Sequence, residues 1–242
     1  MDKTINSQGQ FPTIKTLLEA GVHFGHRARF WNPKMRPFIY GKREGIYIID
    51  IEKTLERLRV AYDFIRRVAE QGEDILFVGT KQPAKPIIEE EAQRCGALYV
   101  NERWVGGLLT NFPVVSTRIA RYLELEKVIQ EGGIEKLSPK EAVLIQKEYL
   151  RLKKVFAGLR HMERLPGAIY VVDARREETA IREARRVKIP IVTFIDTNSD
   201  PTLIDYPIPG NDDAMRSIKL ITSVIADAVL EGRKVLEQEG EI

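Results

Sequence analysis

The residues best suited to chemistry lie between Glu19 and Glu44, in a stretch that contains no acidic side chain. Its cations are Arg27, Arg29, Lys34, Arg36, Lys42 and Arg43, and its aromatic rings are Phe24, Phe30, Trp31, Phe38 and Tyr40. The six cations exceed the +3 net charge of the whole chain, so positive charge is concentrated here. Cations beside flat rings suit a polyanion, because its phosphates supply affinity and its bases can stack. We therefore expect this basic segment, residues 20–43, to bind nucleic acid.

A competing interpretation of the basic segment places its rings in a core and its cations on a solvated rim. The spacing of residues 23–37 argues against it, because this stretch fits neither the helical period of 3.6 nor the strand period of two, and glycine and proline interrupt it. We expect an ordered functional loop there. The apolar runs 38–40 and 46–49 then flank a short polar turn, which predicts a β-hairpin with Lys42 and Arg43 at its tip.

Two further stretches carry candidate contacts for phosphate. Lys81 follows an apolar run in the sequence Val-Gly-Thr-Lys, but the glycine spacing of a P-loop is missing. Lys81 therefore either contacts an RNA phosphate at the end of a strand or is a free surface lysine. Arg103 and Asn111 flank a Gly-Gly pair that permits close backbone approach, so both could donate to phosphate or ribose oxygens. Trp104 beside them is favoured as an anchor to the core.

Acidic residues follow the last two predicted strands. They are Asp173, Asp196, Asp200 and Asp205. Such a group could bind Mg²⁺ or catalyse a reaction, but no nucleophile and base occur in recognisable spacing. We favour roles as caps or ion partners for Asp173 and Asp196 and expect no catalytic residue. Whether Asp196, Asp200 or Asp205 holds a divalent ion stays open.

The histidines and the cysteine do not form a metal signature. His23 and His26 have no cysteine or carboxylate at local spacing, so we expect no metal site, and His26 has a structural role or bonds to RNA. The single Cys95 excludes an internal disulfide and is expected to pack rather than react.

Strand and helix patterns alternate over most of the chain. Apolar, β-rich runs at 74–78, 97–100, 168–172 and 189–195 are typical of buried parallel strands. Helical patterns occur at 55–69, 86–94, 177–187 and 212–232. The alternation predicts an α/β fold with a doubly wound, mainly parallel sheet in three layers, as in flavodoxin-like and Rossmann-like proteins.

Residues 113–165 depart from this alternation. A capping box at Ser138, with proline at the first helical position, opens a long helical pattern whose apolar residues recur at spacings of four and three. An upstream helical pattern offers a partner face, and Gly132-Gly133 permits a reversal. We therefore predict an antiparallel coiled-coil hairpin at 113–165, inserted into a globular domain of residues 1–112 and 166–242. Its outer cations Lys147, Arg151 and Lys154 form either a solvated face or a contact face for RNA or protein.

Six motifs in order resemble the bacterial ribosomal protein S2 family. They are GVHFGHRARFWNPKMRPFIY at 21–40, GIYIID at 45–50, VGTK at 78–81, NERWVGGLLTNF at 101–112, DAR at 173–175, and 191–200 followed by IPGND at 208–212. The resemblance runs from about residue 13 to 232, and only the ends of the chain lack it. Six motifs in one order are far more specific than any single motif.

The resemblance implies both a fold and a function. The family combines a three-layer α/β domain with a protruding coiled-coil hairpin. Its members are structural constituents of the small ribosomal subunit that bridge rRNA of the head and the body, contact neighbouring proteins and help hold the first small-subunit protein, S1. With the basic segment, the resemblance implies rRNA contacts at His26, Arg27, Arg29, Trp31, Lys34, Arg36, Lys42, Arg43, Lys81, Arg103, Asn111 and Arg175.

The composition, with 43% hydrophobic and 30% charged residues, is that of a soluble globular protein. No apolar run approaches the ~18 residues that span a bilayer, and residues 1–10 lack the apolar core of a secretion signal. We expect a cytoplasmic protein with no membrane contact, no cofactor and no homo-oligomer. The alternative function is a doubly wound enzyme for a phosphorylated sugar or nucleotide, with Lys81 and Asp173 or Asp196 at its site.

Overall fold

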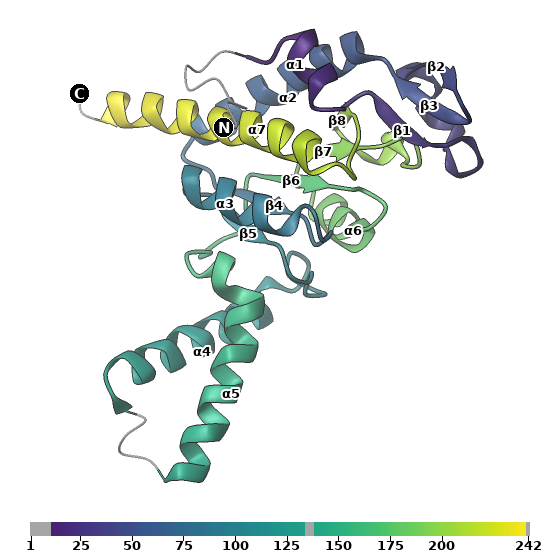
Figure 1. Cartoon of the computed structure of the whole chain (residues 1–242). Helices are drawn as coiled ribbons and strands as arrows, with labels where there is room; N and C mark the ends of the chain where they lie inside the picture. Colours follow the sequence, from purple (N-terminus) through teal and green to yellow (C-terminus); the bar gives the residue numbers. More distant parts are fainter. Residues whose placement is uncertain (1–10, 134–137, 241–242) are drawn as a thin grey trace, which may run out of the picture.

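The computed structural model describes residues 11–133 and 138–240 and is built around a five-stranded sheet (Figure 1). The strands are β4 (Ile75–Val78), β5 (Leu98–Val100), β6 (Ala168–Val172), β7 (Ile191–Ile195) and β8 (Tyr206–Pro209). They lie in the order β5-β4-β6-β7-β8, and every adjacent pair is parallel. This is the strand order of flavodoxin-like doubly wound folds. The predicted α/β class with a parallel sheet is confirmed.

Helices cover both faces of this sheet. Successive side chains of a strand point to opposite faces, and β4, β6 and β7 are almost entirely apolar, so both faces must be buried. The first face is covered by α2 (Ile51–Glu70), α3 (Lys85–Cys95) and α7 (Met215–Gly240), with the short α1 (Ile14–Glu19) beside them. Phe77 and Tyr170 belong to the apolar cluster on that face, whereas Leu76 and Val171 belong to the cluster on the other face, together with α6 (Glu178–Arg186). Among the described helices, none is long and apolar enough to cross a membrane.

Two elements differ from the sequence prediction. Strand β8 was not predicted, because Pro207 and Pro209 lack the backbone N–H of a regular strand; it lies at the edge of the sheet, where that donor is not needed. Helix α7 was expected to end at Gly232 but continues to Gly240. Gly232 is retained inside the helix because a Cβ there would lie 2.3 Å from the carbonyl oxygen of Arg66 in α2.

The basic segment folds into a second, antiparallel sheet. Its elements are β1 (Phe24–Arg27), the 3₁₀ helices η1 (Ala28–Phe30) and η2 (Pro33–Phe38), β2 (Ile39–Arg43) and β3 (Ile46–Ile49), with strand order β1-β3-β2. The predicted hairpin is confirmed as β2 and β3, and it turns at Glu44 and Gly45, whose φ angles of 51° and 81° suit a tight hairpin turn. Lys42 and Arg43 were expected at the tip but are the last residues of β2, because they pair with Tyr47 and Ile46 of β3. The prediction of a loop is wrong for residues 24–27, which form a strand because they pair with β3.

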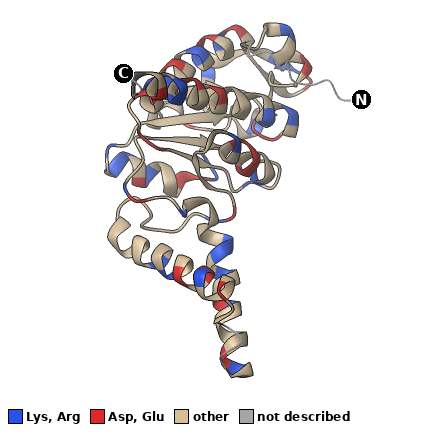
Figure 2. Cartoon of the chain, turned by 90° about the vertical axis from the view of Figure 1, so that its left-hand side faces the viewer, with Lys and Arg blue, Asp and Glu red and all other residues tan. Residues whose placement is uncertain are grey.

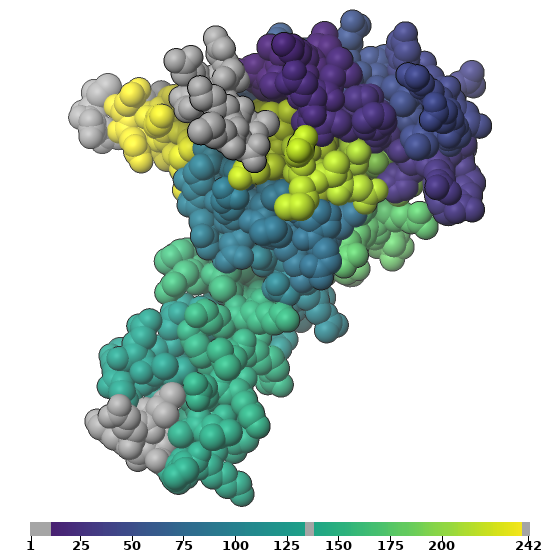
Figure 3. Space-filling model, in the orientation of Figure 1, coloured from purple at the N-terminus to yellow at the C-terminus, as the bar shows by residue number. Residues whose placement is uncertain are grey.

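Helices α4 (Phe112–Gln130) and α5 (Pro139–Phe156) project away from the sheet (Figures 1 and 3). Helix α5 begins at the predicted capping box, and η4 (Ala157–Leu159) follows it. The two helices pack together, and the rings of Tyr122 and Tyr149 stack with centroids 5.9 Å apart. Coiled-coil packing along the full length of the two helices stays a prediction.

The apolar face of the two projecting helices is buried only close to the sheet. Ile119 and Phe156 are buried there, whereas Ile145, nearer the start of α5 and farther from the sheet, is only half-buried. The buried inner residues belong to the same apolar cluster as Leu76 of the sheet. The root of the two helices is therefore part of the globular core.

The loop that leads into α4 is held by the carboxylate of Glu183 in α6. One carboxylate oxygen accepts hydrogen bonds from Trp104 Nε1 at 3.0 Å and from the Gly107 N–H at 2.8 Å. The other accepts from the Leu109 N–H and from the N–H and hydroxyl of Thr110. Burial would raise the pKa of Glu183, but these bonds hold it below its ordinary value. The prediction that Trp104 anchors this root is confirmed.

The core location of the root predicts two outcomes for shortened chains. Replacing residues 127–144 with a short glycine-serine linker should leave urea unfolding, followed by circular dichroism, cooperative and nearly unchanged, because the described residues there are exposed or half-buried. Replacing residues 114–164 should abolish cooperative unfolding, because it removes Val115, Ile119 and Phe156, and each such buried side chain typically contributes about 2–5 kcal/mol. Equal stability of the two shortened chains would contradict the assignment of the root to the core.

Glu183→Gln should lower the free energy of unfolding at neutral pH by about 1–3 kcal/mol, because an amide NH₂ would face backbone donors that the carboxylate now accepts. Because the pKa of Glu183 is lowered in the folded chain, its stabilisation is present above the unfolded pKa of about 4.3 and is lost as the pH falls through the folded value. Urea unfolding at a series of pH values measures this loss. The exposed Glu178→Gln on the same helix is the control, and a pH-independent effect of Glu183→Gln would contradict the assignment.

Candidate nucleic-acid interface

All six cations of the basic segment are exposed, on the small antiparallel sheet and its 3₁₀ helices. Arg29 lies over the ring of Phe30, with its guanidinium carbon 4.5 Å from the ring centroid. Two of the six have a carboxylate partner outside the segment: Lys34 Nζ lies 2.6 Å from Asp200 Oδ2, and Arg43 Nε lies 4.0 Å from Glu44 Oε1. The helices of the rest of the molecule carry both acidic and basic residues (Figure 2). The basic segment therefore presents cations that acidic neighbours within the segment do not offset.

The aromatic rings of the basic segment divide into two groups. Phe24, Phe30 and Tyr40 are 48%, 48% and 81% exposed, so each offers ring surface to a partner, although Arg29 covers one face of Phe30. Trp31 is half-buried against Tyr47, with ring centroids 4.7 Å apart, and Phe38 packs against the core. The interpretation that the rings belong to a core therefore holds for Phe38 and in part for Trp31, and it is wrong for the exposed rings.

The basic segment is fastened to the loop after β7. The N–H of His26 donates to Thr197 Oγ1 at 2.9 Å, and the N–H of Asn32 donates to the Thr197 carbonyl oxygen at 2.7 Å. Gly25 permits this approach, because a Cβ there would lie 2.6 Å from Thr197 Cγ2. Met35 is fully buried beneath the segment. The exposed cations therefore stand on a fixed support.

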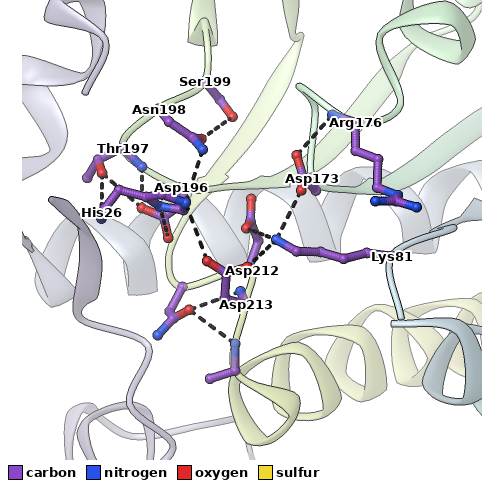
Figure 4. A network of polar contacts seen from close by, with 12 residues as sticks. His26, Lys81, Asp173, Arg176, Asp196, Thr197, Asn198, Ser199, Asp212 and Asp213 are labelled. Carbon is purple, nitrogen blue, oxygen red and sulfur yellow. Dashed lines mark hydrogen bonds and ion pairs between the residues drawn. The ribbon is translucent and has the colours of Figure 1, made fainter. Parts of the chain in front are cut away.

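Lys81 lies in a cluster of carboxylates (Figure 4). Its Nζ is 3.0 Å from Asp173 Oδ2 and 2.7 Å from Asp212 Oδ1, and it also pairs with Asp213. The side chain is only 16% exposed, so the interpretation of Lys81 as a free surface lysine is wrong. Burial alone would lower the pKa of Lys81, but the carboxylates raise it above its ordinary value. A contact with RNA phosphate stays a prediction.

This cluster occupies the switch point of the sheet. Lys81 follows β4 and Asp173 follows β6, and the strand order reverses between these two strands. Doubly wound proteins bind ligands in the crevice at that place. Here the Thr80 N–H, which also lies after β4, donates to the buried Glu177 Oε1 at 2.8 Å. The polar groups that could receive a substrate phosphate are therefore bonded to one another.

His26 joins the cluster from the basic segment. Asp196 Oδ2 lies 3.0 Å from its Nδ1, and Asp213 Oδ2 lies 3.4 Å from its Nε2. The hydrogen bond to Asp196 raises the pKa of His26. One donor atom from each of these three residues lies within 4.8 Å of the others, so the group could hold a metal ion. The prediction of no metal site rested on residues close to His23 and His26 in the sequence. It did not include this group, because Asp196 and Asp213 are far from His26 in the sequence.

Asp212 is the most deeply buried acid of the cluster. It is 0% exposed, and its Oδ2 has no hydrogen-bond partner among the described residues. Burial, followed by the nearby charges of Asp173 and Asp196, raises the pKa of Asp212. From the sequence, Asp212 and Asp213 were expected only to begin the helical pattern at 212–232. Because β8 was not predicted, no sequence signal placed these two aspartates directly after a strand.

The remaining aspartates do not share one site. Asp200 accepts from Lys34 Nζ and from the Thr202 N–H, and Asp205 accepts from the Ile191 N–H. Burial would raise the pKa of Asp200, but its bond with Lys34 holds it below the ordinary value. Asp173 caps a turn by accepting from the Arg176 N–H, as predicted.

The other predicted contacts are exposed but scattered. Arg103 and Asn111 lie on the loop at the root of α4, and Arg175 lies at the end of β6. The three cations of α5 face solvent, and Lys154 lies 3.6 Å from Glu102. Figure 1 shows that α5 and the small antiparallel sheet lie at opposite ends of the molecule. The structure therefore brings His26 and Lys81 into one cluster and leaves the α5 cations apart.

Comparison with known proteins gives closely similar relatives. "Small ribosomal subunit protein uS2" of Coprothermobacter proteolyticus is 54% identical over 233 residues, which cover 95% of this chain and 87% of the relative. The protein of the same name from Dictyoglomus turgidum is 54% identical over 95% of this chain and 93% of the relative. The one from Syntrophobacter fumaroxidans is 53% identical over 93% of this chain and 82% of the relative.

The family model described as "Ribosomal protein S2" matches residues 17–232. The match includes the whole basic segment, the carboxylate cluster around Lys81 and both projecting helices. It ends within α7, before the acidic tail. The chain belongs to the ribosomal protein S2 family.

Proposed function

We propose that the chain is a constituent of the small ribosomal subunit whose basic segment binds small-subunit rRNA. The observation that carries the proposal is the set of six exposed cations on the small antiparallel sheet and its 3₁₀ helices, in a segment that contains no acidic residue. Phosphate contacts of this kind supply most of the affinity for a nucleic acid, and the exposed rings of Phe30 and Tyr40 offer faces on which unpaired bases can stack.

Membership of the family makes the chain a structural ribosomal protein and not an enzyme. The geometry agrees with this conclusion. The alternative function assigned substrate binding to Lys81 with Asp173 or Asp196. Lys81 pairs with Asp173, Asp212 and Asp213, and Asp196 faces His26, so these groups are already engaged within the protein.

The finer features of this function rest on the family resemblance. We propose that the globular domain bridges rRNA of the head and body of the subunit, contacts neighbouring proteins and helps hold the S1 protein on the subunit. We also propose that the chain is located in the cytoplasm. We also propose that residues 113–165 act as an inserted coiled-coil hairpin. The exposure of Lys147, Arg151 and Lys154 supports a contact face on α5.

Arg27→Gln combined with Arg36→Gln should flatten the salt dependence of binding to small-subunit rRNA. Both arginines are exposed, so each can neutralise one phosphate, and each lost contact should reduce the slope of log K against log salt by about 0.7 to 0.9. Filter binding across a salt series measures the slope. The control, Arg59→Gln with Arg67→Gln, removes the same charge from exposed positions of α2. Equal slopes for the two double variants would contradict the role of the basic segment.

Sucrose-gradient fractionation of a bacterial extract should place an epitope-tagged copy of this chain with small ribosomal subunits. The Arg27→Gln and Arg36→Gln variant should move toward the top of the gradient, because it loses electrostatic contacts with rRNA while Met35 still anchors the segment. Circular dichroism checks that the variant is folded. Recovery of the unaltered chain only at the top of the gradient, in fractions without ribosomal subunits, would contradict the proposed function.

A further inference from the structure

A groove lies beside the basic segment, at the carboxyl ends of β6 and β7. It has a volume of about 590 Å³ and lies between α6 and the loop that carries η5 (Pro201–Leu203). Asn32 of the basic segment forms part of its wall. The basic segment and the groove therefore adjoin each other, although most of the groove is formed by residues far from the basic segment in the sequence.

The rim of the groove carries three arginines. Arg175 is exposed and has no hydrogen-bond or ion-pair partner among the described residues, and Arg182 is exposed with one neighbour, Glu178, at 2.5 Å. Arg185 donates to the Leu203 carbonyl oxygen at 2.9 Å, which ties α6 to the opposite wall. Two carboxylates also line the groove: Glu178, which pairs with Arg182, and Asp200, which pairs with Lys34. The arginines outnumber the carboxylates, so the rim favours an anion.

The floor of the groove is apolar. Ala174 and Ile181 are buried beneath it, and Leu203 in its wall is 39% exposed. A volume of this size falls within the range of about 300–1,000 Å³ that holds small organic ligands. An apolar floor beneath a guanidinium rim matches a nucleotide, because the base offers a flat face and the phosphate offers a charge that arginine binds in a fork geometry.

We propose that this groove holds one unpaired nucleotide of RNA, with its phosphate against Arg175 and Arg182 and its base over Leu203 and Ile181. The inference rests on the proposed rRNA-binding function and assigns it a second contact beyond the basic segment. An RNA chain fits better than a free nucleotide, because the groove is continuous with the exposed cations that would bind the adjoining phosphates. A base paired in a duplex would be held away from the floor.

The phosphate contact is tested by three single substitutions in the full chain. Arg175→Gln and Arg182→Gln should each reduce the slope of log K against log salt by about 0.7 for a short single-stranded oligoribonucleotide. Arg186→Gln is the matched control, because Arg186 is exposed on the same helix as Arg182 but does not line the groove. The same slope change in all three variants, or none in either groove variant, would overturn the proposal.

The base contact is tested by comparing the oligoribonucleotide with the same strand in a duplex. The unaltered chain should bind the single strand more tightly, and Leu203→Ala should reduce that preference while leaving duplex binding unchanged. An unchanged preference in Leu203→Ala, with the folded state verified by circular dichroism, would overturn the assignment of the floor. If the unaltered chain binds neither the single strand nor the duplex, the proposed function itself fails. If the unaltered chain binds RNA and the groove substitutions leave that binding unchanged, the groove proposal alone fails and the basic segment remains the RNA-binding element.

Discussion

The ion-pair cluster around Lys81 holds together segments that are far apart in the sequence. Lys81 follows β4, Asp173 follows β6, and Asp212 and Asp213 precede α7. Through Asp213 the cluster also reaches His26 of the basic segment. Buried charges are costly to desolvate and are tolerated only when they are well paired. Loss of the ammonium would leave several carboxylates close together, so the position of each segment depends on this one side chain.

The cluster also explains how a doubly wound sheet carries a structural function. Its crevice at the switch point would be the place for a substrate. In this chain the crevice contains groups that bond to each other. The exposed cations lie beside it, on the small antiparallel sheet with its 3₁₀ helices and on the rim of the adjoining groove. The sheet edge therefore serves as a support for an external surface, with Thr197 as the point of attachment.

A second buried carboxylate organises the opposite end of the molecule. Glu183 in α6 accepts hydrogen bonds from the loop that leads into α4, and α6 also carries Arg182 on the groove. One short helix thus connects the root of the projecting helices with a proposed RNA contact. The Glu183 bonds and the shared apolar cluster together fix the root against α6.

The local sequence was sufficient for the parallel sheet, for a hairpin between the apolar runs 38–40 and 46–49, for the capping box of α5 and for the concentration of cations, because each depends on nearby residue types and their periodicity. It was not sufficient for β1, which forms by pairing with β3, or for β8, whose prolines are tolerated only at a sheet edge. Lys81, His26 and Glu183 acquired their partners only through tertiary structure. Burial and charge pairing depend on distances between segments remote in sequence, and only the folded chain determines those distances.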